Sequence, residues 1–239
     1  MKKIRKIHTE SRSVYGSPRV HQALKQQGLY VGKKRIERLM RNHDIKGRIV
    51  KVTRRQPGLK RFVARGENRR LKAPEATSIN QIWVGDITYL KVNKSYQFLI
   101  VIMDIYSRKI LGWRLSTSRT TQDTVSVLKR VVKQRQPEQE IIFHSDRGIE
   151  YTGHHYRDAL KKYHIEPSVN RLGKCTDNGH MESFFHSLKA ELIRGRTFKT
   201  GRELRASLSS YINHFYNTKR LHSGIGYHSP IEYEKLIAH

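Results

Sequence analysis

The sequence contains one cysteine, Cys175, and so has no partner for an internal disulfide. A lone cysteine is typical of proteins that work in a reducing compartment. Long apolar runs are missing too, because the longest, Phe98 to Met103, is far shorter than the about 20 residues that span a bilayer. The first residues, Met1 to Lys6, lack the apolar segment of a signal peptide. These absences argue against a disulfide-rich secreted domain or a membrane protein, and they predict a cytoplasmic protein.

Acidic residues are also scarce. There are 20 Asp and Glu against 48 Lys and Arg, which gives a formal net charge of +28 on 239 residues. Residues 1–75 hold 23 basic and 5 acidic side chains, so the positive charge is concentrated there. A phosphate backbone binds such a surface with an affinity that falls steeply with salt. An anionic membrane is the competing partner, but no basic stretch carries the wide apolar face of an interfacial helix, so nucleic acid is the predicted partner.

Residues 1–46 have the pattern of a helix-turn-helix. Apolar residues recur at helical spacing in two groups within residues 17–46, with Gly28 and Gly32 between them, which predicts two short amphipathic helices around a turn. The second helix carries basic residues on its remaining faces, where a recognition helix would meet a DNA groove. These candidate DNA-binding residues are Lys33, Lys34, Arg35, Arg38 and Arg41. A solvated basic face on an ordinary helical hairpin explains the pattern equally well.

Residues 47–75 are predicted to form a basic linker. Between Lys46 and Lys72 there are eleven Lys and Arg residues and a single acid, Glu67, with no sustained periodicity. This charge suits a strap along a phosphate backbone, and Arg54 and Arg55 are candidate DNA contacts within it. A solvated tether is the alternative, and the two interpretations are compatible if the linker becomes ordered on DNA.

The middle of the chain has the pattern of an α/β domain. Val, Ile, Tyr and Trp are frequent from Ile82 to Ser118, with breaks at Asn93-Lys94 and near Ser107-Arg108, which predicts three strands in a meander. Helices and short strands then alternate. The predicted strands are 82–92, 95–105, 109–117, 141–145 and 166–170, and the predicted helices are 121–134, 155–163 and 179–193. This order predicts a mixed sheet covered by helices on both faces.

Three carboxylates occupy distinctive places in this domain. Asp86 lies inside the first predicted strand, Asp146 follows the fourth, and Glu182 lies in the first turn of the helix 179–193. Singly, each has a structural explanation, such as a backbone hydrogen bond, a turn or the helix dipole. If they converge, they repel one another unless a divalent cation is present, and oxygen ligands suit Mg²⁺ or Mn²⁺, which also bind phosphate oxygens. The pattern therefore indicates phosphoryl transfer on nucleic acid.

Other site chemistries fit less well. Zinc is disfavoured because a lone cysteine cannot complete a Cys₂His₂ set and no His-x₃-His brackets a glutamate. His144 and His180, each close to one of the acids, are expected to support the site or face DNA rather than bind metal. Ser145 lacks the Gly-x-Ser-x-Gly elbow of a hydrolase.

Taken together, these residues resemble the DDE transposases of bacterial insertion sequences, specifically the IS3-family transposase or its separately encoded catalytic frame. The resemblance extends from about Tyr15 to the C-terminus. It rests on Asn80–Trp83 with Asp86–Tyr89, on Ser145–Gly148 with Tyr151-Thr152, on Asp177-Asn178 with Met181–Phe185 and Leu188-Lys189, and on Tyr216-Asn217, Arg220, His222 and Ser229-Pro230. In addition, 35 residues separate Asp146 from Glu182, as the family's D,D(35)E signature requires.

The resemblance implies a ribonuclease-H-like core over residues 76–200, followed by a C-terminal helical segment over 201–239. It implies that Asp86, Asp146 and Glu182 are catalytic and bind two Mg²⁺ or Mn²⁺ ions per active site, in a reaction that cleaves the ends of an insertion sequence and transfers the strands.

Two further residues have roles implied by the same resemblance. Lys189, seven residues after Glu182, is where the family keeps a basic residue, and it is expected to hold terminal DNA phosphates; an exposed lysine lying over Phe185 is the alternative. Asn178 is expected to cap the helix and so aim Glu182, with capping alone as the alternative.

Two departures from the family's pattern affect the site. Ile149-Glu150 replaces small and amide residues and adds a fourth acid, which is expected to face solvent rather than bind metal. Gly179-His180 replaces small apolar residues and makes the start of the catalytic helix harder to predict.

The expected partners are double-stranded DNA, as element ends and as target, and further copies of the chain assembled on that DNA. No leucine-zipper-like segment precedes the helix-turn-helix, so the product of an upstream reading frame, or a fusion with it, is another candidate partner. No membrane partner is expected, and the resemblance implies a bacterial protein associated with the nucleoid.

Three other functions remain open at this point. A retroviral-type integrase would share the core, but its His-His-Cys-Cys zinc module needs two cysteines. A catalytically silent DNA-binding regulator of transposition would keep the helix-turn-helix over a damaged carboxylate set, and all three acids are present. A nonspecific metal-dependent nuclease would use the same chemistry, so that only its products would distinguish it.

Overall fold

The computed structural model describes residues 1–48, 66–172 and 175–238. The chain divides into two compact units. The core unit contains Thr53–His186 and Gly195–Leu208, and the terminal unit contains Met1–Val52, Ser187–Arg194 and Ser209–His239. Among the described residues, no helix is long and apolar enough to cross a membrane.

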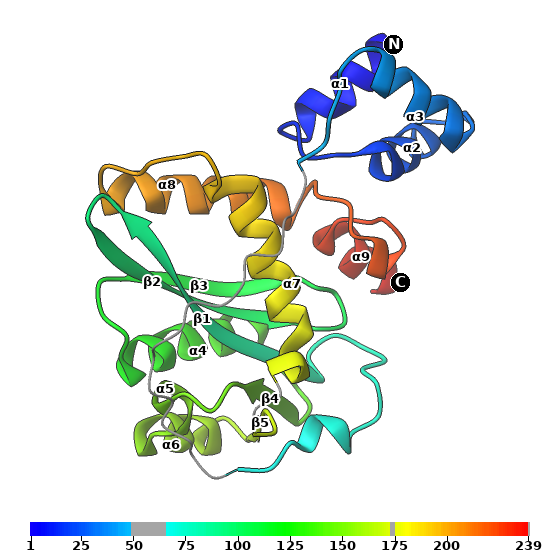
Figure 1. The fold of residues 1–239 in the computed structure, drawn as a ribbon. Helices are drawn as coiled ribbons and strands as arrows, with labels where there is room; N and C mark the ends of the chain where they lie inside the picture. The colour runs from blue at the N-terminus through cyan, green and yellow to red at the C-terminus, as the bar shows by residue number, and fades with distance from the viewer. Residues whose placement is uncertain (49–65, 173–174, 239) are drawn as a thin grey trace. The chain divides into compact units, whose positions relative to one another are not determined.

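The core unit is built on a five-stranded mixed sheet (Figure 1). Its strands are β1 (Ile82–Val92), β2 (Ser95–Asp104), β3 (Ile110–Ser116), β4 (Ile141–Ser145) and β5 (Ile165–Val169), in the spatial order β3-β2-β1-β4-β5. The first three pair antiparallel, whereas β4 pairs parallel with both β1 and β5. The predicted meander followed by alternating helices and strands is confirmed.

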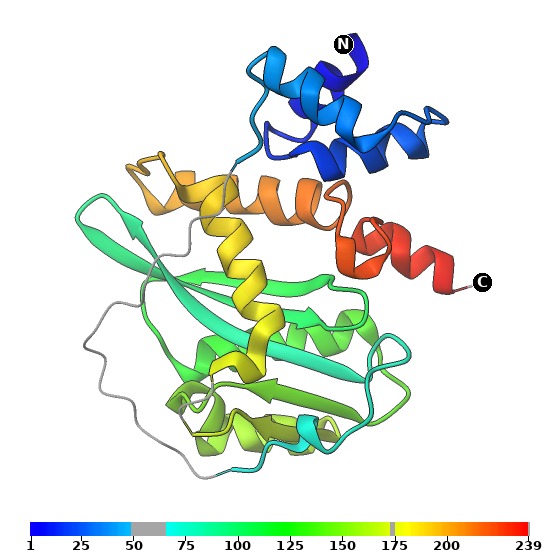
Figure 2. The same cartoon turned by 45° about the vertical axis from the view of Figure 1, so that its right-hand side comes forward.

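Helices pack on the sheet through alternating apolar residues. On one face, α4 (Thr121–Arg135), the short α5 (Ile149–Thr152) and α6 (His154–Lys162) enclose a core with strand residues such as Trp83 and Ile100. Leu99 and Val101, which point to the opposite face of β2, are also fully buried. Figures 1 and 2 show α4 on one side of the sheet and the beginning of α7 (Gly179–Leu188) on the other. Both faces of the sheet are therefore covered, as predicted.

The terminal unit begins with three helices, α1 (Lys2–Glu10), α2 (Ser17–Gln26) and α3 (Lys33–Asn42). The predicted pair corresponds to α2 and α3, which bury apolar residues at helical spacing, such as Val20 and Leu24 on α2. The helix α1 was not predicted, although Ile4 and Ile7 are buried on its inner face. These two isoleucines among basic residues form too short a pattern to identify a helix by periodicity alone.

The helix predicted over 179–193 and the first helix of the predicted C-terminal segment exist but change geometry along their length. α7 passes into a π-helical turn over Lys189–Ile193, and α8 (Gly201–Tyr211) passes into another over Ile212–Tyr216. Single π turns of this kind depend on tertiary packing and leave no periodic signal in the sequence. The chain then ends with α9 (Pro230–Ile237), which begins with a capping box in which Ser229 accepts the backbone N–H of Glu232.

Candidate active site

Asp86 and Asp146 are brought together by the pairing of two parallel strands. The register of β1 with β4 pairs Trp83 with Phe143 and Val84 with His144. Asp86 and Asp146 each lie two residues beyond this last pair. Asp86 is still inside β1, opposite Val101 of β2, and Asp146 follows the end of β4, so the two stand side by side where the parallel pairing ends. Sites of α/β sheets gather beyond the carboxyl ends of parallel strands, and Asp146 directly follows the carboxyl end of β4.

The pKa of Asp86 reflects these neighbours. Burial within the sheet and then the negative charge of Asp146 raise the pKa of Asp86 to about 8, and Glu182 raises it further. The backbone N–H of Ile87, 2.8 Å from Asp86 Oδ1, and the positive charge of Arg119 act in the opposite direction. A carboxylate opposed by neighbouring carboxylates needs a compensating cation to stay ionised at neutral pH.

Glu182 is carried by the first turn of α7, and its side chain is exposed. Directly before this helix, Asn178 donates from Nδ2 to the backbone oxygen of Gly85, at 3.2 Å, and is almost fully buried. The amide thus ties the start of α7 to β1 at the residue preceding Asp86. Gly85 itself admits no side chain, because a Cβ there would lie 2.5 Å from the ring of Phe143.

The turn before α7 is held by a second acid, Asp177. Its Oδ1 lies 2.9 Å from Arg171 Nη2, and its Oδ2 accepts from Asn68 Nδ2, also at 2.9 Å. These contacts hold the pKa of Asp177 well below its usual range. Arg70 donates to the backbone oxygen of Asp177 and lies 3.2 Å from the ring of His180.

This cluster shows that the end of the linker is docked on the core unit. Glu67 accepts the backbone N–H of Val169 on β5, and Arg70 N donates to Ser168 Oγ. Arg147, directly after Asp146, donates to the backbone oxygen of Gly66 at 3.0 Å. Residues 66–71 therefore contact Arg147, directly after Asp146, and the turn that precedes the Glu182 helix. This docking could not be predicted, because in the sequence the segment is only a run of charged residues.

The two histidines next to the acids are supported from within the protein. His144 is fully buried, with Nδ1 at 2.8 Å from Ser168 Oγ and Nε2 at 2.7 Å from Asn170 Oδ1. Burial lowers its pKa to about 4, so it is neutral. The alternative in which His144 faces DNA is wrong. His180 is half-buried, and burial lowers its pKa to about 4 as well.

Glu150 is the fourth acid near the site, and the expectation that it faces solvent is wrong. Only 4% of the residue is exposed. Its carboxylate forms two contacts with Arg119, Nε to Oε1 at 2.6 Å and Nη2 to Oε2 at 2.9 Å. Arg119 lies in the loop before α4, 31 positions before Glu150, so no local sequence motif indicates the pair.

The acids themselves are the donor type that suits a cation, because Mg²⁺ and Mn²⁺ prefer carboxylate oxygens. Among the described residues, Tyr151 Oη and Asn178 Oδ1 are buried oxygens without a hydrogen-bond partner. Burial raises the pKa of Tyr151 well above 10, and the charges of Asp86, Asp146 and Glu150 contribute. Within the described part of the chain, no three His, Cys, Asp or Glu side chains are grouped closely enough to hold a metal ion as they stand.

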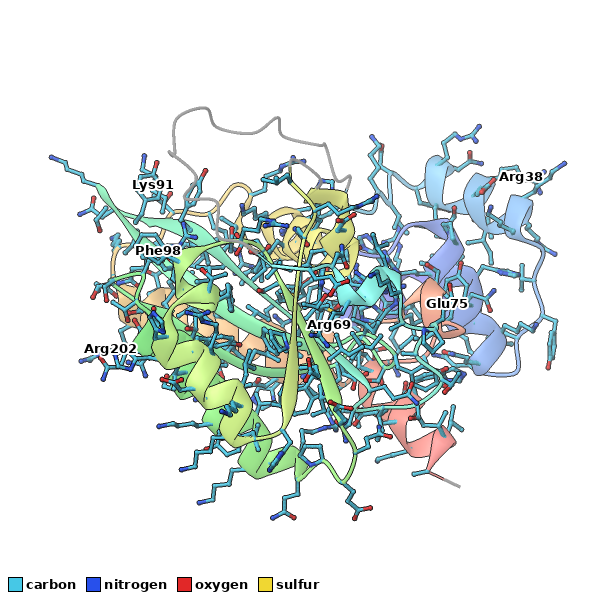
Figure 3. All side chains as sticks on the ribbon, turned by 90° about the horizontal axis from the view of Figure 1, so that it is seen from below. Arg38, Arg69, Glu75, Lys91, Phe98 and Arg202 are labelled. Carbon is cyan, nitrogen blue, oxygen red and sulfur yellow. The ribbon has the colours of Figure 1, made fainter. Side chains whose placement is uncertain are left out.

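The predicted DNA-binding residues lie in different surroundings. All five basic residues of α3 are exposed, and Lys33 pairs with Glu37 at 3.8 Å. Figure 3 shows Arg38 extending outward from its helix. Lys189 belongs to the terminal unit, where it begins the π-helical turn and is half-buried. Arg54 and Arg55 lie outside the described residues.

Comparison with known proteins defines the class first. A family model described as an integrase core domain matches residues 76–175, another integrase core model matches 182–236, and an HTH-like domain model matches 1–53. A solved intasome of simian T-cell lymphotropic virus, with a PP2A regulatory subunit, superposes with a TM-score of 0.54 at 17% identity over 97% of this chain and 74% of that one. The fold is therefore that of a ribonuclease-H-like integrase core with an HTH-like helical region.

Sequence relatives then give the particular family. The transposase for insertion sequence element IS904 of Lactococcus lactis is 32% identical over 98% of this chain and 92% of its own length. Transposase InsF for insertion sequence IS3A of Escherichia coli is 34% identical over 95% of this chain and 78% of its own. The chain belongs to the IS3 family of insertion-sequence transposases, as the sequence resemblance indicated.

Proposed function

We propose that this transposase cleaves the ends of an insertion sequence and transfers the strands by phosphoryl transfer, with Asp86, Asp146 and Glu182 as its catalytic triad. The proposal rests above all on the parallel register that places Asp86 and Asp146 side by side, where the charge of Asp146 raises the pKa of Asp86. Glu182 adds a third carboxylate to the same electrostatic group.

The three carboxylates would hold two Mg²⁺ or Mn²⁺ ions, which when bound lower the pKa of an attacking water or hydroxyl and stabilise the departing 3′-oxygen. The chain's own residues supply the frame. The β1–β4 register fixes Asp86 and Asp146, and the amide of Asn178 ties the start of the Glu182 helix to β1. We propose that Asn178 acts through this contact to aim Glu182. Its free Oδ1 provides an acceptor for a water molecule in the site.

We further propose a division of labour along the chain. Residues 1–46 bind double-stranded DNA through the basic face of α3, residues 47–75 link this region to the catalytic core over 76–200, and residues 201–239 form a C-terminal helical segment. Arg54, Arg55 and Lys189 would add phosphate contacts. Transposition would take place on the bacterial nucleoid, with several copies of the chain on the element ends and target, alone or fused to an upstream-frame product.

The decisive experiment incubates the full chain with a labelled duplex taken from the DNA that flanks its gene, in Mg²⁺ and then in Mn²⁺. We expect metal-dependent nicking at the element end followed by joined products. Glu182→Gln should abolish both while DNA binding persists, because affinity resides in the basic surface. Glu138→Gln is the matched control, since Glu138 is an exposed acid on the connection between α4 and β4.

The products separate the remaining possibilities. Cleavage at many positions without joining would indicate a nonspecific nuclease. Binding without cleavage in either metal would indicate a regulator, or a requirement for the upstream-frame partner, which adding that protein would reveal. Equal activity of Glu182→Gln and Glu138→Gln would contradict the assignment of the triad.

A further inference from the structure

Arg119 and Glu150 form an ion pair at the edge of the candidate active site. The guanidinium meets the carboxylate with two nitrogens, Nε at 2.6 Å from Oε1 and Nη2 at 2.9 Å from Oε2. The Glu150 side chain is only 6% exposed, whereas that of Arg119 is 34% exposed. A buried carboxylate thus depends on one arginine that reaches it from the protein surface.

The pair lies directly beside Asp146. A Cβ built on Gly148 would lie 2.6 Å from Glu150 Oε2, 2.9 Å from Arg119 Nη2 and 2.9 Å from Asp146 Oδ1. Asp146 Oδ1 also accepts the backbone N–H of Gly148, at 2.9 Å. The carboxylates of Asp146 and Glu150 and the guanidinium of Arg119 therefore all lie beside the same glycine.

Contacts at the start of α4 hold both residues of the pair in place. Arg119 directly precedes Thr120, the N-cap of α4, whose side chain accepts the backbone N–H of Asp123 at 3.2 Å. The backbone oxygen of Glu150 accepts the hydroxyl of Thr124 on the same helix, at 2.9 Å. The start of α4 thus aims the arginine and holds the acid, so the geometry of the pair is fixed by the fold.

Without Arg119, the carboxylate of Glu150 would stand beside Asp146 with no positive partner. Mg²⁺ and Mn²⁺ prefer carboxylate oxygens, and an additional one within reach would compete with Asp146 for the cations. The planar guanidinium of Arg119 donates two hydrogen bonds to the carboxylate of Glu150 at once. A lysine ammonium, which acts as a point charge, would match the carboxylate less well.

We propose that Arg119 is a positioning residue that keeps Glu150 out of the cation-binding group, so that Asp146 rather than Glu150 faces the cations. This role rests on the proposed function of the three acids. One member of the pair, Glu150, stands where the family resemblance leads us to expect an uncharged residue.

The test measures cation binding and strand transfer separately on the full chain. Mn²⁺ binding is followed by calorimetry for the wild type, Arg119→Ala, Glu150→Gln and the double variant. Arg119→Ala removes a positive charge and frees a carboxylate, so we expect Mn²⁺ to bind at least about tenfold more tightly while strand transfer falls at least about tenfold. Glu150→Gln and the double variant should both remain within about threefold of the wild type in strand transfer.

Rescue by the double variant is the critical result, because it shows that the harm of losing Arg119 comes from the freed carboxylate. A double variant as slow as Arg119→Ala would overturn the proposal and indicate that Arg119 acts on its own, for example on DNA. A tenfold loss in Glu150→Gln would also overturn it. If circular dichroism shows that Arg119→Ala does not fold, Glu150→Gln and Arg119→Lys decide. Glu150→Gln should keep Mn²⁺ affinity within about threefold, whereas Arg119→Lys, which holds the carboxylate less well, should bind Mn²⁺ more tightly than the wild type.

Asp146→Asn separates this proposal from the function on which it rests. Weaker Mn²⁺ binding in that variant shows that the acids form a cation site, whatever the activity. Unchanged binding would mean that the proposed function itself has failed. If Asp146→Asn shows that the cation site exists, equal Mn²⁺ affinity of Arg119→Ala and the wild type would contradict only the proposed role of Arg119.

Discussion

Asp86 and Asp146 each lie two residues beyond Val84 and His144, the last residues that pair β1 with β4 in parallel. Their proximity therefore follows from the strand register and needs no flexible loop. A register shift of one residue would turn the side chains of a strand to the other face of the sheet and separate the two acids. The stability of the β1–β4 pairing is thus also a condition for the candidate site.

The pH dependence of stability should report the charge on Asp86. In the metal-free protein the pKa of Asp86 is raised to about 8, against about 4 in an unfolded chain. Between these values the folded state binds more protons, so folding stability contributed by this group is lost as pH rises. We expect Asp86→Asn to gain thermal stability over the wild type as the pH is raised from about 4 to about 8, with the gain reduced by Mg²⁺.

Melting temperatures of the two proteins across this range provide the measurement. Asp158→Asn is the control, because Asp158 is an exposed acid on α6 and its difference from the wild type should stay constant with pH. A constant difference for Asp86→Asn as well would mean that Asp86 ionises with an ordinary pKa.

Most of the fold could be predicted because its elements carry local signals. The strands around Asp86 are rich in β-branched and aromatic residues, and Asn93, with φ of 51°, marks the turn between β1 and β2. The π-helical turns after Leu188 and Tyr211 could not be predicted, since they arise where packing overrides the helical repeat. Helix propensity and hydrophobic periodicity do not show where packing outweighs the regular α-helical geometry.

The residues of the candidate site also divide into those that could be predicted from the sequence and those that could not. Asp86, Asp146 and Glu182 could be selected because each stands at a recognisable place in a strand, after a strand or in a helix. The surroundings of Glu150 could not, because its partner Arg119 is distant in sequence and both residues look like solvated charges. Asn178 was expected to cap a helix, and its side chain instead donates to Gly85 on β1. Long-range polar pairs of this kind require the three-dimensional structure.

Asp177 should influence catalysis without touching DNA. Its carboxylate joins Arg171 and Asn68 and so fixes the turn that precedes α7. We expect Asp177→Asn to reduce strand transfer by about 10- to 100-fold, a typical effect of residues that orient metal-binding side chains. A gel-shift assay should show unchanged DNA binding. Glu166→Gln is the matched control, because Glu166 pairs with Arg69 of the same docked segment but is 38% exposed. Equal losses in the two variants would contradict a specific role for Asp177.

The basic face of α3 should determine the salt dependence of DNA binding. Arg38 and Arg41 are both exposed. If each contacts one phosphate, replacing both with alanine should lower the slope of log K against log salt by about 2. Lys129→Ala with Lys133→Ala is the control, since these residues are exposed on α4 of the core unit. An unchanged slope in the α3 variant, measured by fluorescence anisotropy on a duplex, would place the DNA-binding surface elsewhere.

The strongest test of the terminal unit concerns the buried pair Arg220 and Glu191. Arg220 Nη2 lies 2.6 Å from Glu191 Oε1, Tyr211 donates to Oε2 at 2.6 Å, and both charged residues are at most 6% exposed. Arg220→Met would leave a buried carboxylate unpaired, which should lower the free energy of unfolding by about 3–5 kcal/mol in urea denaturation. Adding Glu191→Leu should restore most of this loss, because the unpaired charge is removed as well. Lys6→Ala breaks only the exposed Lys6–Glu10 pair and should cost less than about 1 kcal/mol. An Arg220→Met loss no larger than that of Lys6→Ala would show that the pair is dispensable for stability.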